Sequence, residues 1–156
     1  ASDVYKRQPL FGSQGNGVTL IKRGDKLPVP MQHHVDGLYY LQRYVDSGEG
    51  QWHDHRVFVI RGRAIAAMVR HGASWVNNVA LGGRCEALPL SGELIALAEA
   101  ASKAVDIDYC GVDIIRGQDG KAYVLEVNSI PAWKGLQSVV EIDIAQALVD
   151  DCLGLS

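Results

Sequence analysis

Apolar and polar residues alternate along two short segments in the C-terminal third of the chain. The segments are Gly111–Ile115 and Val124–Asn128, and the residues between them include Asp119-Gly120. Alternation with a period of two is typical of strands, and Asp-Gly is a strong hairpin signal. The pattern therefore predicts an antiparallel hairpin over these residues.

Other segments have the composition of strands or the spacing of helices. The expected strands are 18–21, 38–45, 56–60 and 64–69. The last two are joined by a tight turn at 61–63. Helices are expected over 91–105, with Ser91 as the N-cap, and over 143–152. The segments expected to be irregular are 22–37 and 129–135. The order of elements predicts an α+β fold with a largely antiparallel sheet.

The two strands of the C-terminal hairpin carry polar residues that interrupt their apolar runs. Glu126 and Asn128 lie two residues apart and so share a face, and the hairpin lets Asp113 lie opposite them. Two carboxylates and an amide oxygen suit Mg²⁺, which keeps its other positions for water and phosphates. The alternative is a set of solvent-facing residues on a half-buried sheet. On the first interpretation, the protein handles a nucleotide.

Length, charge and cysteine content narrow the class of protein. The 156 residues, 47% apolar and 21% charged, fit one soluble domain with one core, and no apolar run is long enough to span a membrane. A net charge of −3 argues against nucleic acid as a ligand. Cys85, Cys110 and Cys152 form no C-x-x-C pair, which favours reduced, buried thiols in a cytoplasmic protein.

A glycine-rich segment, Gly12-Ser13-Gln14-Gly15-Asn16-Gly17, precedes the first expected strand. It matches neither the dinucleotide-binding fingerprint nor the phosphate-binding P-loop, because the spacing, the Lys-Ser/Thr ending and the following helix are missing. Its exposed backbone N–H groups could still close over phosphate oxygens. Taken alone, such a segment is more often a structural turn.

Histidines offer a second metal hypothesis. His53 and His55 alternate along a strand and so share one side of it, where they could bind Zn²⁺ with a third ligand. No spaced partner accompanies them, and His33-His34 falls in a segment expected to be irregular. Structural zinc sites normally have four ligands, so the pattern favours this site less than the Mg²⁺ site.

Five motifs follow one another along the chain. They are Pro9–Gly17, Leu41–Val45, Asp54–Val59, Gly111–Asp113 and Leu125–Asn128. In this combination they resemble the ATP-grasp superfamily, and more narrowly the RimK-type amino-acid ligases. The resemblance implies an ATP-grasp fold and an ATP-dependent carbon–nitrogen ligase that adds glutamate to a carboxylate of a protein or cofactor.

The resemblance also implies a role for each matching residue. The glycine-rich segment, from Gly12 to Gly17, would cover the triphosphate of ATP. The residues that would follow the adenine are Gln42, Arg43, Tyr44 and Val45. The implied ligands of Mg²⁺, with Mn²⁺ as the alternative ion, are Asp113, Glu126 and Asn128. Arg56, Arg70 and Asn78 match phosphate and acyl-phosphate contacts, where a fixed guanidinium neutralises charge. The alternative for Arg56 and Arg70 is an ordinary arginine on the surface of a strand, and for Asn78 it is an ordinary residue of a loop.

The implied reaction transfers the γ-phosphate of ATP to a carboxylate, and an amine then attacks the acyl phosphate to give an amide. The implied partners are an amino acid and a carboxylate acceptor, either a cofactor or a protein C-terminus. Nucleic acid and membrane are not implied, a homo-oligomer is left open, and the expected location is the cytoplasm. The alternative function is a catalytically silent nucleotide-binding or interaction module.

Two departures from the family pattern affect the expected domain organisation and acceptor. Gln8 stands where the family has a lysine that holds the α-phosphate, and residues 2–8 resemble translated sequencing-adapter sequence. We therefore expect residues 1–8 to be a non-native leader on an N-terminally truncated fragment. The expected subdomains are a remnant with the glycine-rich segment and hinge over 9–45, and a C-terminal part with the metal site over 46–156. Residues 129–135 resemble a subgroup tied to methanopterin-type cofactors, which leaves the acceptor open.

Overall fold

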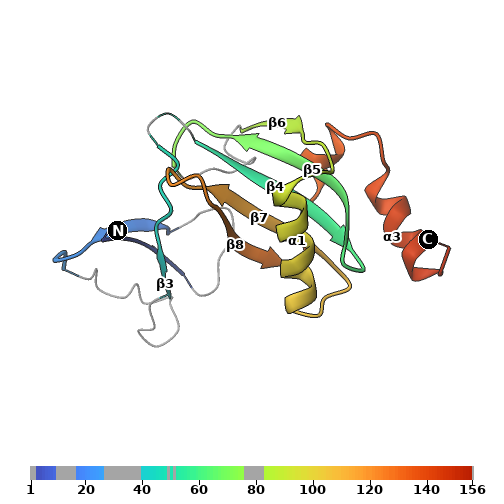
Figure 1. Ribbon diagram of the computed structural model, residues 1–156, viewed down its shortest axis with the longest axis horizontal. Coiled ribbons are helices and arrows are strands. Elements are labelled where there is room, and N and C mark those ends of the chain that lie inside the picture. The colour runs from blue at the N-terminus through green and yellow to red at the C-terminus, as the bar shows by residue number, and fades with distance from the viewer. Residues whose placement is uncertain are drawn as a thin grey trace. The chain divides into compact units, whose positions relative to one another are not determined.

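The computed structural model describes residues 3–9, 17–26, 40–48, 50, 52–75 and 83–155. The chain forms two compact units, residues 1–46 (unit 1) and residues 47–156 (unit 2). Each unit contains its own antiparallel sheet (Figure 1). Among the described residues, no helix has the length and apolar character needed to cross a membrane.

Unit 1 contains a three-stranded sheet. Its strands are β1 (Val4–Gln8), β2 (Thr19–Lys22) and β3 (Tyr40–Arg43), in the order β2-β1-β3. The central strand β1 was not predicted, because its polar residues outnumber its apolar ones and the alternation signal is weak. Arg7, in β1, is buried and lies opposite Thr19 and Leu41. Val4–Gln8, which were expected to belong to a leader, thus form the central strand of this sheet.

Unit 2 contains a five-stranded sheet. Its strands are β4 (His53–Ile60), β5 (Arg63–His71), β6 (Arg84–Ala87), β7 (Tyr109–Arg116) and β8 (Ala122–Asn128). Their order is β6-β5-β4-β7-β8, and every neighbouring pair is antiparallel. The predicted α+β class, the antiparallel sheet and both hairpins are confirmed. Arg61 and Gly62 both have a positive φ, which suits the tight turn between β4 and β5. Strand β6 was not predicted.

Three helices complete unit 2. They are α1 (Glu93–Ala104), α2 (Lys134–Gln137) and α3 (Ile144–Cys152). Helix α1 follows Gly92, which has a φ of 82° and gives no side-chain cap, so the expected cap at Ser91 is wrong. Helix α3 agrees with its prediction: the carboxylate of Asp143 accepts a hydrogen bond of 3.0 Å from the N–H of Gln146. The short helix α2 lies at the end of the segment that was expected to be irregular.

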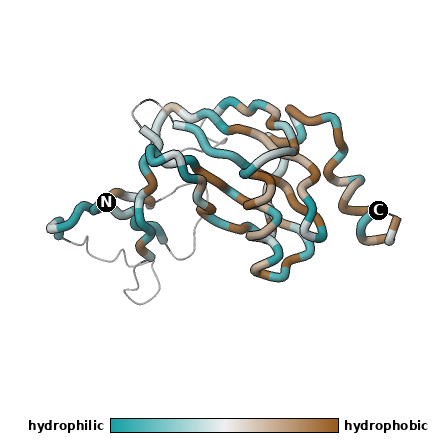
Figure 2. The backbone as a smooth tube through the Cα atoms, in the orientation of Figure 1, coloured by the Kyte–Doolittle hydropathy of each residue, from teal (hydrophilic) through white to brown (hydrophobic). Residues whose placement is uncertain are grey.

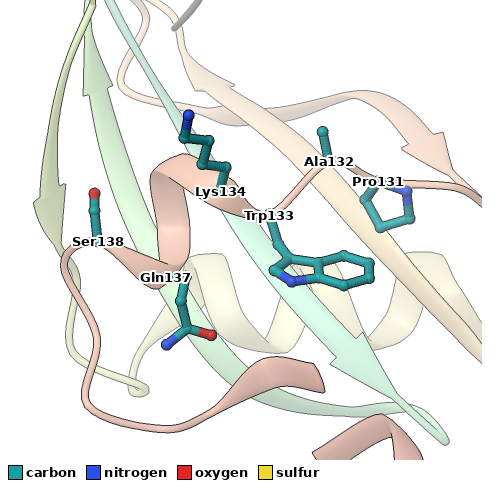
Figure 3. Close-up of a pocket in the computed structure, with 6 residues that line it drawn as sticks. All are labelled: Pro131, Ala132, Trp133, Lys134, Gln137 and Ser138. Carbon is teal, nitrogen blue, oxygen red and sulfur yellow. The ribbon is translucent and has the colours of Figure 1, made fainter. Parts of the chain in front are cut away.

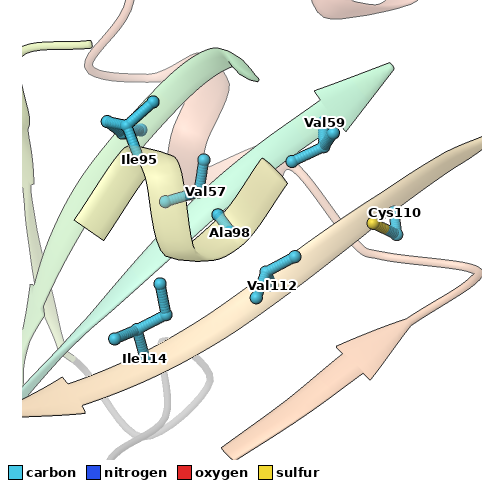
Figure 4. Close-up of a cluster of buried hydrophobic side chains, with 8 residues drawn as sticks. Val57, Val59, Ile95, Ala98, Cys110, Val112 and Ile114 are labelled. Carbon is cyan, nitrogen blue, oxygen red and sulfur yellow. The ribbon is translucent and has the colours of Figure 1, made fainter. Parts of the chain in front are cut away.

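Strand β4 is buried on both faces, which explains its continuous apolar run. Val57 and Val59 belong to a cluster with Ile95 and Ala98 of α1 and with residues of β7 (Figure 4). Phe58 and Ile60 point to the other face, where a second cluster joins the sheet to α2 and α3. The other buried members of the second cluster are Ala66, Met68, Leu136 and Ile144. Hydrophobic stretches accordingly follow the strands of this sheet (Figure 2).

The three cysteines are free thiols in different environments. Cys110 lies in the cluster under α1, and burial raises the pKa of its thiol. Cys85 is half-buried, and burial raises the pKa of its thiol as well. Cys152 is exposed at the end of α3, so the prediction of buried thiols is wrong for this residue.

Gly111 permits a close approach between β7 and the segment that follows β8. A Cβ at this position would lie 2.8 Å from the Cβ of Pro131, which is fully buried. Gly111→Ala should therefore lower the free energy of unfolding by about 1–3 kcal/mol, the usual cost of overpacking. Urea denaturation of both proteins measures this difference. Pro131→Gly removes the opposing Cβ, so the same change should cost less in that background; an equal cost in both backgrounds would contradict the packing argument.

His55 links the stability of unit 2 to pH. Its ring is buried with Nδ1 3.3 Å from the carbonyl oxygen of Ile114, and burial lowers the pKa of the imidazole. The unfolded chain therefore binds a proton more readily, so stability should fall as pH drops below about 6.5 toward the folded-state pKa. His55→Gln should reduce this slope, which is at most about 1.4 kcal/mol per pH unit for one proton. Urea denaturation between pH 5 and 8 measures it, and identical slopes would contradict the assignment.

Candidate active site

Five charged side chains lie in a row across four neighbouring strands of unit 2. Together they are called the charge ladder, and they are Arg70 of β5, Asp54 and Arg56 of β4, Asp113 of β7 and Glu126 of β8. The first four residues are at most 8% exposed, whereas Glu126 is exposed. Buried charges are costly unless they are paired, so the contacts within the ladder decide what it can do.

Asp113 lies between two guanidinium groups. Nε and Nη2 of Arg56 donate to its two carboxylate oxygens, both at 2.6 Å, and Nη2 of Arg70 lies 2.9 Å from Oδ2. Arg70 also donates from Nε and Nη2 to the two oxygens of Asp54, at 2.7 and 2.8 Å. Nη2 of Arg56 lies 4.0 Å from Oε1 of Glu126. These two-point pairs fix the planes of both guanidinium groups.

The two buried carboxyl groups respond differently to this environment. Burial alone would raise the pKa of Asp113, but the hydrogen bonds and charges of Arg56 and Arg70 outweigh it and hold the pKa below its usual value. For Asp54, burial outweighs Arg70 and raises the pKa. The pKa of Arg70 is raised, because its carboxylate partners outweigh its own burial. Asp113 is therefore ionised at neutral pH.

Two β-bulges bring the ladder onto one face of the sheet. The register between β4 and β5 shifts by one residue at Ile65, and the register between β7 and β8 shifts at Leu125. Without the first shift, Arg70 would face the opposite side from Asp54. The second shift places Glu126 directly opposite Asp113. Both bulges therefore re-aim side chains toward the site, as bulges near active sites commonly do.

The predicted metal ligands are close enough in the sheet to act together. Asp113 and Glu126 are cross-strand partners, as expected, and Gly111 lies opposite Asn128. The side-chain oxygen of Asn128 accepts a 3.0 Å hydrogen bond from the N–H of Ile130, and an amide oxygen has a second lone pair. Asp113 accepts three contacts from the two arginines, whereas a carboxylate can accept about four. The set therefore has room for a cation.

The charge balance of the ladder sets how it would hold such a cation. Three carboxylates face two guanidinium groups, which leaves one net negative charge. This is little charge for a divalent ion by itself. It suits Mg²⁺, which is usually held by one or two carboxylates and completes its shell with water and substrate phosphates. The residues present therefore fit the expected ion.

The zinc hypothesis is not supported. The rings of His53 and His55 lie 5.7 Å apart and nearly perpendicular, and His71 adds a third ring 6.1 Å from His53. Within the described part of the chain, no group of three or more His, Cys, Asp or Glu side chains could hold a metal ion. The described residues therefore do not support the zinc alternative, while His33-His34 lies outside them.

The remaining predicted site residues belong to unit 1 or lie outside the described residues. Gly17 forms the turn before β2 and has a φ of 73°. Gln42 and Arg43 end β3, and Tyr44 and Val45 follow it. The predicted residues outside the described part are Gly12, Ser13, Gln14, Gly15 and Asn78.

The sequence pattern missed Asp54 as a site residue. Its position two residues before Arg56 shows that the two side chains share a face, which was the available signal. Its pairing with Arg70 depends on the bulge at Ile65, and no signal in the local sequence predicts that bulge. The pairing of Asp54 with Arg70 therefore follows only from the register of β4 and β5 in the structure.

A pocket of about 600 Å³ adjoins the ladder on unit 2. The residues that line it are Pro131, Ala132, Trp133, Lys134, Gln137 and Ser138 (Figure 3). Nη1 of Arg56 donates to the carbonyl oxygen of Ala132 at 3.4 Å, and the ring of Trp133 packs edge-on against Phe58. Arg56 thus contacts both the metal-ligand candidates and the wall of the pocket.

Curated relatives align with almost the whole length of this chain. It is 36% identical over 151 residues to the tetrahydromethanopterin:alpha-L-glutamate ligase of Methanococcus maripaludis, covering 94% of this chain and 51% of the relative. It is also 36% identical to a probable alpha-L-glutamate ligase of Haemophilus ducreyi, covering 92% of this chain and 48% of the relative. The chain therefore spans about half the length of the curated relatives it matches.

Solved structures share the fold. The ATP-grasp ligase PsnB, complexed with a minimal precursor, Mg and ADP, aligns with a TM-score of 0.70 at 23% identity, covering 99% of this chain and 46% of PsnB. The D-cycloserine synthetase DcsG aligns with a TM-score of 0.68 at 21% identity, covering 96% of this chain and 56% of DcsG. The ATP-grasp fold expected from the sequence is confirmed.

The family model agrees with these alignments. The model for the RimK-like ATP-grasp domain matches residues 6–152, which include every strand and residue of the charge ladder. With this match, the chain belongs to the RimK-like ATP-grasp family.

Proposed function

We propose that this chain carries the metal site and the phosphate-binding arginines of an ATP-dependent carboxylate–amine ligase. The observation that carries the proposal is the charge ladder, in which two fixed guanidinium groups lie beside three oxygen ligands suited to Mg²⁺. Membership in the RimK-like ATP-grasp family and the names of the curated relatives support the ligase class.

The reaction proceeds in two steps. A carboxylate of the acceptor attacks the γ-phosphorus of ATP, the bond from that phosphorus to the bridging oxygen breaks, and ADP leaves. The amine of an amino acid then attacks the carbonyl carbon of the acyl phosphate, phosphate leaves, and the nitrogen loses a proton. Because the transferred group carries its charge on oxygen, the protein acts mainly by positioning groups and neutralising charge.

The residues of the ladder have distinct parts in this reaction. Asp113, Glu126 and Asn128 hold Mg²⁺, with Mn²⁺ as an alternative ion of the same preference for oxygen. The bound ion neutralises phosphate oxygens and orients them for transfer. Arg56 is kept in place by Asp113 and by the carbonyl of Ala132, so its guanidinium meets the developing charge without reorganising.

Most of the other proposed contacts of ATP lie in unit 1, and the rest lie in unit 2. Gly17, with the glycine-rich segment before it, contacts the phosphates, and Gln42, Arg43, Tyr44 and Val45 contact the adenine. Asn78 and Arg70 contact the transferred phosphoryl group. These assignments rest on the order of the family motifs along the sequence.

Glutamate is the proposed amine donor, and a cofactor or peptide carboxylate is the proposed acceptor. The relatives are named as glutamate ligases, one of them for tetrahydromethanopterin. We assign the body of the acceptor to the pocket beside Arg56, where the Trp133 ring offers an apolar face and the exposed Lys134 offers a positive charge.

Glu126→Ala tests the metal site directly. The variant should bind Mg-ATP about 100-fold more weakly, since changes around metal ligands already cost about 10- to 100-fold. Glu126 is exposed, so the fold should survive the change. Calorimetric titration of Mg-ATP into the 156-residue chain, with and without chelator, measures the loss, and circular dichroism checks the fold.

Glu141→Ala is the matched control, because Glu141 is an exposed carboxylate outside the ladder. It should bind Mg-ATP like the parent. Metal-dependent binding that survives Glu126→Ala in a folded protein would contradict the assigned site. Binding by the parent without turnover of any carboxylate and amine pair would instead favour a silent nucleotide-binding module.

A further inference from the structure

We propose that Asp54 is a positioning residue for the metal site. It holds Arg70 in place and balances part of its positive charge. Asp113 then does not have to balance Arg70 by itself and keeps an oxygen available for the metal ion. The inference rests on the proposed function, and it extends the proposed metal site by one residue. In this role Asp54 acts through Arg70 and Asp113 and is not itself a ligand of the metal ion.

The contacts around Arg70 show which carboxylate orients it. Nε and Nη2 of Arg70 donate to the two carboxylate oxygens of Asp54, at 2.7 and 2.8 Å, and Nη2 also lies 2.9 Å from Oδ2 of Asp113. Two parallel bonds fix the plane of a guanidinium group, whereas one contact leaves it free to swing. The orientation of Arg70 is therefore set by Asp54 more than by Asp113.

Burial gives this arrangement its strength. Arg70, Asp54 and Asp113 are each at most 8% exposed, so water screens their charges weakly. Asp113 already balances Arg56 through two bonds of 2.6 Å. If Asp54 were neutral, more of the charge of Arg70 would fall on Asp113, and a cation would have to compete with two guanidinium groups for the same oxygens. The ladder would also lose its net negative charge.

A purely structural role for Asp54 predicts something different. A buried ion pair that serves only stability would change the free energy of unfolding and leave the metal dependence of nucleotide binding as it was. The positioning role predicts a loss of metal affinity that depends on Arg70. The two roles can therefore be separated by measuring the metal dependence in single and double variants.

The first measurement requires no ligand. In ¹H–¹⁵N spectra of the chain, the Nε–H signal of Arg70, identified by its loss in Arg70→Met, should show slow exchange with water because it donates to buried Asp54. Asp54→Asn should shift this signal and speed its exchange at least tenfold. An unchanged Arg70 signal in folded Asp54→Asn would overturn the positioning role.

The second measurement titrates Mg²⁺ and ATP into the same proteins by calorimetry. Asp54→Asn should weaken the binding of Mg-ATP about tenfold, the low end for groups that orient metal ligands, and should not weaken the binding of ATP in chelator. In the Arg70→Met background, Asp54→Asn should change Mg-ATP affinity less than twofold. The reason is that a buried carboxyl without its cation takes up a proton, and a neutral acid resembles asparagine.

Asp108→Asn is the control, since Asp108 is an exposed carboxylate paired with the exposed Arg61 outside the ladder. It should leave both measurements unchanged. Should Asp54→Asn fail to fold, Asp54→Glu, which keeps the charge but displaces the carboxylate from the two-point pair with Arg70, should weaken Mg-ATP binding in the same direction. Equal effects of Asp54→Asn with and without Arg70 would overturn the proposal. A parent chain that does not bind Mg-ATP would overturn the proposed function, while the Arg70 signal would still decide whether Asp54 holds Arg70.

Discussion

The sharing of one carboxylate by two arginines is the interaction on which the site depends. Asp113 joins β7 to β4 through Arg56 and to β5 through Arg70, so buried ion pairs link three strands. The low pKa of Asp113 is the electrostatic signature of this arrangement. It keeps the carboxylate ionised, and an ionised carboxylate is required both by the arginines and by a metal ion.

The apolar packing of unit 2 holds this carboxylate where it is needed. Strand β4 is buried between α1 on one face and α2 and α3 on the other, so its direction is fixed from both sides. The absence of a side chain at Gly111 lets Pro131 approach β7 beside Arg56. The packing of the segment after β8 therefore places both a pocket wall and a hydrogen-bond acceptor next to the guanidinium group.

Local sequence signals predicted the hairpins and the two longer helices, because each depends on neighbouring residues. They also placed Asp113 and Glu126 on facing strands, although the direct opposition of the two residues depends on the bulge at Leu125. They missed β1 and β6, which are short and rich in charged or polar residues. They also missed the pairing of Asp54 with Arg70, because counting outward from the turn at Gly62 puts Arg70 on the wrong face. The bulge at Ile65 shifts that register by one residue, and no local turn signal predicts it.

The energetics of buried charges argue that the ladder serves a purpose other than stability. Further along the same sheet face, Phe58 and Met68 are fully buried and apolar, so the fold can fill this face with hydrocarbon. Apolar side chains of similar volume in place of a buried ion network usually leave a protein equally stable or more stable. Two arginines and two carboxylates at such positions therefore incur a desolvation cost that folding alone does not require. Binding a phosphate-rich ligand together with a divalent ion requires fixed positive and negative groups side by side. This requirement explains why the buried charges are present despite their desolvation cost.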